Sequence, residues 1–234
     1  MIHIGKSNLA NMATIALLSL GSILLPAVHG DPDLSPLDHA QYQWYVENGV
    51  EAETAIELIE KFNNGERIDS LSSVTPVHET RTVENGFNKT RYEYPDGSIS
   101  LSEIQVPDQV VSTYAVVPTS VGSCYSSSSG PGWVQYFDCL VRESNGVWFT
   151  MEFRASYIRA SNGTGTITSA SSPYIHAPGG NATTPVFQTV VLTGNPAHLT
   201  AESQYNFGWP IGSGTARINL YVNGSTAWTT RDGF

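Results

Sequence analysis

The chain has 234 residues, of which 14% are charged, and its formal net charge at pH 7 is −10. Asp and Glu outnumber Lys and Arg by 21 to 11, and the cations form no basic stripe. Because neutralisation of phosphates supplies most of the affinity of nucleic-acid-binding proteins, this composition excludes nucleic acid as a partner. The length is sufficient for one medium domain or two small ones with a sizeable core.

The first 30 residues predict a cleavable secretory signal peptide. Lys6 precedes an uncharged apolar run from Met12 to Ala27, and Val28-His29-Gly30 supplies a suitable cleavage site before Asp31. The alternative is an uncleaved membrane anchor, which needs roughly 20 apolar residues, and this run is shorter. The next cation is Lys61, so no positive charge follows the run closely. We therefore expect a secreted, extracellular protein with no membrane association after cleavage.

The acidic residues are concentrated in the front half of the exported part. Residues 31–108 contain 16 Asp and Glu against five Lys and Arg, whereas residues 109–234 contain five of each kind. Cleavage removes one cation, Lys6, and no acid, so the net charge changes from −10 to −11. This asymmetry predicts two parts after the signal peptide: an acidic helical hairpin plus β-meander over 31–108, and a disulfide-pinned antiparallel β-sandwich domain over 109–234.

A short αα-hairpin is predicted at the start of the exported chain. Ser35 is placed as the N-cap of a helix from Pro36 to about Glu47, with Asp38 three residues after the cap. Asn48-Gly49 ends that helix, and a second helix follows from about Glu51 to Phe62. The second helix has an apolar stripe and an acidic stripe, which we interpret as a solvated face rather than a calcium site. These stripes consist of Ile56, Ile59 and Phe62, and of Glu53, Glu57 and Glu60.

From Val77 onward the apolar residues alternate with period two, which predicts antiparallel strands. Asn85-Gly86, Pro95-Asp96-Gly97 and Asn223-Gly224 are strong turn signals between three pairs of strands. The predicted strands cover residues 78–84, 87–94, 99–106, 110–117, 133–142, 146–158, 164–170, 186–193, 198–207, 216–222 and 225–230. Short strands and Gly-rich turns without intervening helices indicate a sandwich, Ig-like or related, or a partial barrel. The predicted fold class is therefore α+β.

Two cysteines, Cys124 and Cys139, both lie in the exported part. An even number of cysteines in an oxidising compartment favours one disulfide. A thiol nucleophile or a metal ligand would need companions, and the sequence has neither C-x-x-C spacing nor a histidine close by. We therefore predict a structural Cys124–Cys139 bridge.

Two passages carry a resemblance to a group of known sequences. One consists of Asn48-Gly49-Val50, Leu58-Ile59-Glu60-Lys61, Gly65-Glu66 and Asp69-Ser70, and the other is Tyr94-Pro95-Asp96-Gly97-Ser98. They resemble the front half of uncharacterised exported proteins of Gram-positive bacteria, in which a helical hairpin precedes a YPDGS strand pair and a disulfide-bearing β domain. The similarity is close over about residues 37–106 and general elsewhere. It implies a bacterial envelope or extracellular location, and no activity or catalytic residue.

Residue types suited to catalysis are present, but they form no catalytic motif. The serines near residues 126–129 are not in a G-x-S-x-G elbow. Asp138 and Glu152 could face each other across a hairpin, yet Arg154 nearby makes ion pairing the simpler interpretation, and Glu143 is placed in the turn of that hairpin. We expect no cofactor and no metal site, and assign no catalytic residue. The exported part has four histidines, in no H-E-x-x-H or H-x-H pattern: His39, His78, His176 and His198.

Aromatic residues at loop edges or opposite the apolar stripes are the candidate ligand-stacking groups. They are Trp133, Trp148, Tyr174, Trp209 and Tyr221. Exposed rings stack on sugars, although burial between two sheets would hide Trp148. We expect a non-catalytic protein that binds at the cell envelope or to extracellular material, with cell wall or polysaccharide as the ligand. The alternatives are a secreted hydrolase whose site is assembled only in three dimensions, and a secreted antagonist or inhibitor.

Overall fold

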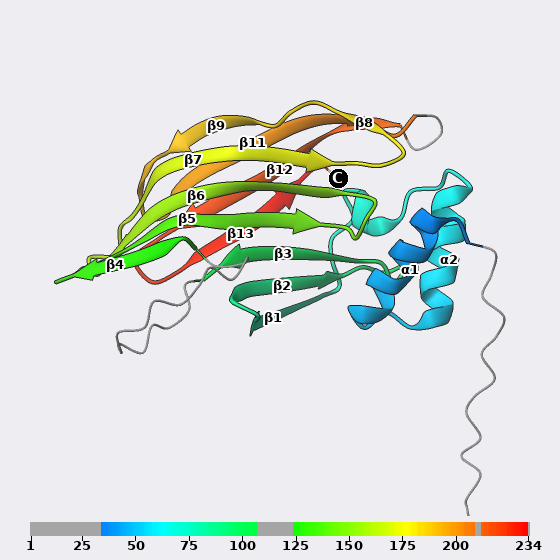
Figure 1. Ribbon diagram of the computed structural model, residues 1–234, viewed down its shortest axis with the longest axis horizontal. Helices are drawn as coiled ribbons and strands as arrows, with labels where there is room; N and C mark the ends of the chain where they lie inside the picture. Colours follow the sequence, from blue (N-terminus) through cyan, green and yellow to red (C-terminus); the bar gives the residue numbers. More distant parts are fainter. Residues whose placement is uncertain (1–33, 107–123, 209–211, 234) are drawn as a thin grey trace, which may run out of the picture. The chain divides into compact units, whose positions relative to one another are not determined.

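The computed structural model describes residues 34–106, 124–208 and 212–233 (Figure 1). The predicted signal peptide, the predicted strand 110–117 and Trp209 lie outside these residues. Leu34–Phe234 forms one compact unit. Within the part of the chain that is described, no helix has the length and hydropathy needed to cross a membrane.

The predicted helical hairpin is confirmed. Helix α1 spans Pro36–Glu47, and the Ser35 hydroxyl accepts a hydrogen bond of 3.2 Å from the Asp38 N–H, as expected for an N-cap. Helix α2 spans Ala52–Asn63 and is followed by a 3-10 turn, η1, over Asp69–Leu71. The acidic stripe is exposed, as predicted for a solvated face, and consists of Glu53, Glu57 and Glu60.

The rest of the described chain forms two antiparallel sheets (Figure 1). The eight-stranded sheet, here the large sheet, has the order β1 (His78–Glu84), β2 (Phe87–Glu93), β3 (Ile99–Gln105), β5 (Trp133–Ser144), β6 (Thr150–Ala160), β7 (Gly165–His176) and β10 (Thr193–Gly194), with β4 (Ser126–Gly130) on β5. The five-stranded sheet, here the small sheet, has the order β13 (Ala227–Asp232), β12 (Ser213–Val222), β11 (Ala197–Asn206) and β8 (Asn181–Ala182), with β9 (Val186–Val191) on β11. The fold is therefore α+β with antiparallel sheets.

Strands on both sides of the predicted border between residues 108 and 109 belong to the same sheet. Strand β3 pairs directly with β5, with Leu101 opposite Ser144 and Ile104 opposite Val141. This pairing makes the acidic front half and the disulfide-bearing half parts of one hydrogen-bonded ladder.

Strand β4 is the main element that the sequence does not predict. The strands predicted from the sequence do not include its residues, Ser126 to Gly130, but the structure pairs them with Phe137 to Trp133 on β5. Their four serine side chains are exposed, so the strand is held by its backbone and has no apolar alternation to detect.

The core lies between the two sheets. On β6 the buried residues are alternate ones, as the sequence predicts for a strand with one covered face. Rings from the two sheets meet there: Phe153 and Phe187 have centroids 5.4 Å apart, at 78°. Further buried side chains from both sheets are Val141, Met151, Ala155, Tyr157, Leu199, Ala201, Ile218, Leu220 and Val222.

Trp148 fixes the helical hairpin against the sheets. Its side chain is fully buried, its ring stacks on Phe62 of α2 at 4.0 Å, and Tyr45 of α1 packs edge-on at 6.0 Å. The Gln41 side-chain oxygen also accepts a 2.8 Å hydrogen bond from the Val147 N–H. Trp148 is therefore a core residue, and its interpretation as a ligand-stacking group is wrong, because α1 and α2 cover the end of β5 and β6.

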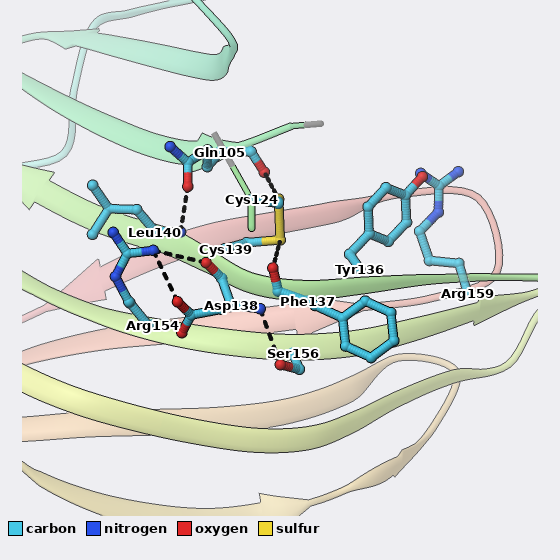
Figure 2. Close-up of a disulfide and its surroundings, with 10 residues drawn as sticks. All are labelled: Gln105, Cys124, Tyr136, Phe137, Asp138, Cys139, Leu140, Arg154, Ser156 and Arg159. Atoms are coloured by element: carbon cyan, nitrogen blue, oxygen red, sulfur yellow. Dashed lines mark hydrogen bonds and ion pairs between the residues drawn. A yellow bond between two sulfur atoms is a disulfide. The ribbon is translucent and has the colours of Figure 1, made fainter. Parts of the chain in front are cut away.

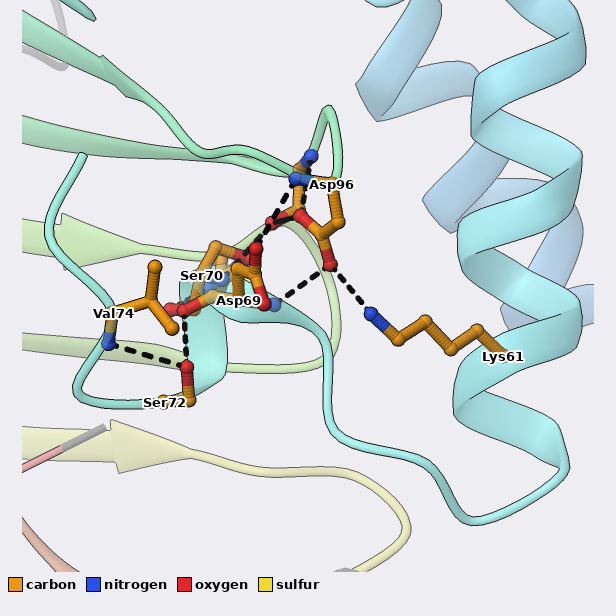
Figure 3. A network of polar contacts seen from close by, with 8 residues as sticks. Lys61, Asp69, Ser70, Ser72, Val74 and Asp96 are labelled. Atoms are coloured by element: carbon orange, nitrogen blue, oxygen red, sulfur yellow. Dashed lines mark hydrogen bonds and ion pairs between the residues drawn. The ribbon is translucent and has the colours of Figure 1, made fainter. Parts of the chain in front are cut away.

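The YPDGS turn is a structural junction (Figure 3). One oxygen of Asp96 accepts bonds from the Lys61 ammonium at 2.9 Å and from the Asp69 N–H at 2.8 Å, and the other oxygen accepts the Ser98 hydroxyl at 2.6 Å. Partial burial acts to raise the pKa of Asp96, but hydrogen bonds from Ser98, Lys61 and Asp69 outweigh it and lower this pKa below its ordinary value. Asp96 thus joins α2, η1 and the turn before β3.

The predicted Cys124–Cys139 disulfide is confirmed (Figure 2). Cys139 is fully buried, and Cys124 is almost fully buried. Beside the bridge, the Leu140 N–H donates a 3.0 Å hydrogen bond to the side-chain oxygen of Gln105. The bridge therefore fastens the segment before β4 to the middle of β5.

Replacing both cysteines, Cys124→Ser with Cys139→Ser, is expected to lower the free energy of unfolding by about 3 kcal/mol. Opening a loop of 15 residues restores conformational entropy to the unfolded chain, and the amount follows from the loop length. Urea unfolding of the variant and the oxidised protein, followed by circular dichroism, measures the difference. Equal unfolding midpoints would contradict the expectation.

Candidate functional site

The described aromatic candidates lie in separate places. Trp133, at the start of β5, and Tyr174, on β7, are 39% and 51% exposed. Tyr221 lies on the outer face of the small sheet and stacks on His198 at 4.4 Å. With Trp148 in the core, the stacking candidates that the structure describes do not form one common patch.

A groove on the outer face of the large sheet, the face turned away from the small sheet, contains one of these candidates. Trp44 of α1 and Tyr174 of β7 line a hollow of about 740 Å³. A second hollow of about 350 Å³, between Phe87 and Ser172, shares Arg142 with the first. We call the two hollows together the outer groove.

A row of alternating charges crosses the floor of the outer groove. The strand registers place Lys89 opposite Glu103, Glu103 opposite Arg142, Arg142 opposite Glu152, and Glu152 opposite Tyr174. The row therefore steps across five neighbouring strands, β2, β3, β5, β6 and β7. Antiparallel sheets bring such opposite residues to within contact distance on one face. Residues distant in the sequence are joined into one polar strip in this way.

The charges of this row are paired with one another. Lys89 Nζ lies 3.3 Å from one oxygen of Glu103, and Arg142 Nη1 lies 3.6 Å from the other. Arg142 Nε donates a 2.8 Å hydrogen bond to Glu152. Glu103 is only 7% exposed, while the side chains of Arg142 and Glu152 are 35% and 26% exposed. A ligand in the groove would therefore meet oriented donors and acceptors from Arg142 and Glu152.

Rings stand at two sides of the charged row. Tyr174 and His176, two residues apart on β7, have nearly parallel rings with centroids 6.5 Å apart. Trp44 is partly exposed on the helical side of the same hollow. Flat rings beside oriented polar groups are typical of sites that bind ligands with both apolar and hydroxyl-bearing faces.

The two acids of the charged row, Glu103 and Glu152, are both paired with cations. The buried one of the two, Glu103, contacts two cations, Lys89 and Arg142. Asp138 and Glu152 do not face each other as a pair, because Asp138 binds Arg154 at 3.2 Å and Glu152 binds Arg142. Within residues 34–106, 124–208 and 212–233, no group of His, Cys, Asp or Glu is arranged to hold a metal ion.

The ion pair predicted for Asp138 also explains an irregularity in β5. Asp138 has a φ of +52°, and the register of β5 against β6 shifts between Tyr136 and Cys139. Arg154 donates to both the backbone and side-chain oxygens of Asp138, and the Asp138 N–H donates to the Ser156 hydroxyl (Figure 2). These bonds hold an extra residue in the strand as a β-bulge.

Glu143 is the ionisable residue that the sequence interpretation places wrongly. It was expected in the turn of the hairpin, but β5 continues to Ser144, and Glu143 faces inward and is 1% exposed. One carboxylate oxygen accepts a 3.0 Å bond from the Thr229 hydroxyl, and the other has no hydrogen-bond partner among the described residues. Burial raises the pKa of Glu143 to about 7, although Arg231 and hydrogen bonds from Ser102 and Thr229 act in the opposite direction. Cys139 and Val141 face inward on the same strand. Extending this alternation by two residues, to Glu143, would have predicted its inward position.

No family model matches the chain, and no curated protein matches it. A crystal structure with a partly similar backbone is that of a hypothetical protein, lmo2686, from Listeria monocytogenes EGD-e. The match has a TM-score of 0.32 and a sequence identity of 18%, and it covers 64% of this chain and 96% of that chain.

Proposed function

We propose that this protein is a secreted, non-catalytic binding protein, and that the outer groove holds a polysaccharide of the cell envelope or of extracellular material. The observation that carries the proposal is the half-exposed Tyr174 ring at the end of the charged row formed by Lys89, Glu103, Arg142 and Glu152. Export is supported by the signal-peptide pattern of residues 1–30 and by the disulfide, since disulfides persist in oxidising compartments.

The polar floor and the rings match the two kinds of surface on a sugar. The apolar face of a pyranose stacks on an aromatic ring, while its hydroxyls need donors and acceptors in fixed positions. Arg142 and Glu152 orient each other through a 2.8 Å bond and remain partly exposed. Arg142 therefore supplies a hydrogen-bond donor and Glu152 an acceptor, and neither side chain needs to change its conformation. A linear polymer could continue from the larger hollow into the smaller one, because Arg142 borders both.

The proposal also includes the type of β fold and the group of exported proteins to which this chain is related. The two sheets constitute a β-sandwich, related to the Ig-like kind, because both contribute buried residues to one core. The chain belongs with the exported proteins of Gram-positive bacteria that share the YPDGS strand pair. Asp96 of the YPDGS turn binds Lys61 of α2 and Asp69 of η1 just before β3. This structural role supports the turn as a feature that related proteins would share.

Tyr174→Ala is expected to weaken binding to insoluble cell wall or polysaccharide by about two- to thirteenfold, because a ring stacked on a sugar contributes about 0.5–1.5 kcal/mol. Arg142→Gln should weaken binding as well, since it removes a charged donor from the floor. Pull-down of the purified protein on a panel of matrices, with binding isotherms on any that retain it, measures both effects.

The matched control is Trp133→Ala, which removes an exposed ring that borders neither hollow of the groove. This variant should bind like the unmodified protein. Retention on no matrix, or equal losses for Tyr174→Ala and Trp133→Ala, would refute the polysaccharide groove.

A further inference from the structure

The charges of the row on the floor of the outer groove cancel. Lys89 and Arg142 both contact Glu103, and Arg142 also pairs with Glu152. Two cations thus stand against two acids, and the row as a whole is neutral. A net charge of the groove must therefore come from side chains outside this row.

Two acids outside the row, Glu47 and Glu84, line the larger hollow. Both are exposed, and neither forms an ion pair with any residue that the structure describes. The remaining cation that lines the groove, Arg154 in the smaller hollow, is balanced by Asp138 at 3.2 Å. With histidine counted as neutral, the outer groove therefore has an excess of two negative charges, those of Glu47 and Glu84.

Glu47 stands at the C-terminal end of α1, whose last turn contains no basic residue. The helix macrodipole places partial negative charge at this end, so an acid there is unfavourable and a cation is favourable. Arg91 donates a 2.9 Å hydrogen bond to the neighbouring Asn48 carbonyl, but its guanidinium also pairs with Glu93, and it does not line the hollow. The helix end and Glu47 together therefore attract a positively charged group of a ligand.

An aromatic ring accompanies the Glu47 carboxylate. Trp44 and Glu47 are three positions apart in α1, a spacing that makes side chains neighbours on a helix surface, and both line the larger hollow. A sugar stacked on Trp44 would therefore hold a substituent of its ring near the Glu47 carboxylate. If that substituent is a cation, the indole attracts it as well, through its negatively polarised face.

We propose that the outer groove binds a polysaccharide whose sugars bear free, protonated amino groups, and that Glu47 and Glu84 each pair with one of these ammonium groups. This inference rests on the proposed polysaccharide groove and adds the chemical class of the sugar. A neutral polymer leaves both carboxylates without a partner, and an anionic polymer brings like charges together. An amino sugar supplies the positive charge that complements the excess of the groove.

The experiment compares two hexasaccharides that differ only at their amino groups: the β-1,4-linked hexamer of glucosamine and its fully N-acetylated counterpart. Acetylation removes the positive charges and keeps the sugar ring and the linkage. At about pH 5.5, where the sugar amines are protonated, calorimetric titration should show about two- to thirtyfold tighter binding of the amino hexamer, as expected for two exposed ion pairs. Added salt should reduce this ratio, because it screens exposed charges.

Two double variants of equal charge locate the preference. Glu47→Gln with Glu84→Gln should bring the affinities for the two hexamers to within about twofold of each other and leave that for the acetylated hexamer nearly unchanged. Glu53→Gln with Glu57→Gln changes the net charge equally, but these exposed acids of α2 line neither hollow, so the preference should persist. An equal loss of preference in both double variants would overturn the proposal, because the preference would then arise from the overall charge of the protein.

The outcomes separate this inference from the groove itself. Equal affinities for the two hexamers, or tighter binding of the acetylated one, would overturn the amino-sugar assignment and leave the polysaccharide groove in place. Binding of neither hexamer would also overturn it, and the panel of matrices then decides on the groove. Tyr174→Ala should weaken binding of both hexamers by the same factor, because ring stacking does not depend on the amine. A hexalysine peptide should bind more weakly than the amino hexamer, and equal or tighter binding would assign the groove to a basic peptide instead.

Discussion

Replacing Trp148 with Ala is expected to lower the free energy of unfolding by about 3–5 kcal/mol, which is the usual cost of deleting a fully buried large aromatic side chain. The indole is 0% exposed and fills the space between α2 and the end of β5 and β6. Its loss would leave a cavity that Phe62 and Tyr45 cannot both close, because they contact different sides of the ring. Urea unfolding followed by far-UV circular dichroism gives the value.

Two further substitutions test whether the cost of Trp148→Ala comes from the loss of the packed ring. Trp148→Phe keeps a ring against Phe62 and removes an indole N–H that has no hydrogen-bond partner in the described chain, so its cost should be well below that of Ala. Trp133→Ala deletes a partly exposed ring and should change the free energy of unfolding by less than about 1 kcal/mol. A cost for Trp148→Ala as small as that of Trp133→Ala would contradict the assignment of Trp148 to the core.

Glu143→Gln is expected to stabilise the protein in alkaline solution by about 3 kcal/mol. Burial raises the pKa of the Glu143 carboxyl in the folded protein to about 7, against an ordinary value of 4.5. Above pH 7 the native state therefore holds a buried carboxylate, one oxygen of which has no partner among the described residues. Gln has nearly the same shape and carries no charge.

The pH window follows from the direction of this shift. Between about pH 4.5 and 7 the folded protein binds a proton at Glu143 that the unfolded chain has released, so the free energy of unfolding falls as the pH rises. The fall is at most about 1.4 kcal/mol per pH unit, and it ends above the folded pKa. The difference between Glu143→Gln and the unmodified protein should therefore be small at pH 4.5 and largest above pH 7.

Urea unfolding at half-unit pH steps from 4.5 to 8.5 measures that difference. Glu152→Gln is the control, because Glu152 is a partly exposed member of an ion pair and its removal should give a small, nearly constant change. A Glu143→Gln difference that does not vary with pH would show that Glu143 is ionised throughout the range.

Local signals in the sequence predict most of the elements of this fold. Ser35 and Pro36 mark the start of α1, and Asn85-Gly86 and Asn223-Gly224 mark two hairpins that the structure contains. These features depend on neighbours within a few residues, which a single sequence displays. Strand β4 and the inward position of Glu143 depend instead on pairing with distant strands, and local composition favours a loop and a turn at these places.

The outer groove was not predictable for the same reason. Tyr174 was identified as an exposed ring, but nothing in the sequence indicates that it stands in line with Lys89, Glu103 and Arg142. Those residues are joined by the register of five strands, and a shift of one residue in any strand would move its member to the opposite face. The burial of Trp148 was hidden from the sequence for a similar reason, because the ring is covered by Phe62 of α2 and Tyr45 of α1, which lie far before it in the chain.

The last strand closes contacts with the beginning of the chain. Arg231 donates a 2.6 Å hydrogen bond to the Ser70 carbonyl, across 161 positions of sequence, and Thr229 reaches Glu143 across 86. During synthesis η1 is complete long before Arg231 has been added to the chain, and contacts between residues so distant in sequence form slowly. We expect the nascent chain to remain open at these contacts until β13 has left the ribosome. The proposed export would benefit from such a delay, because a translocation channel accepts a chain that has not yet folded.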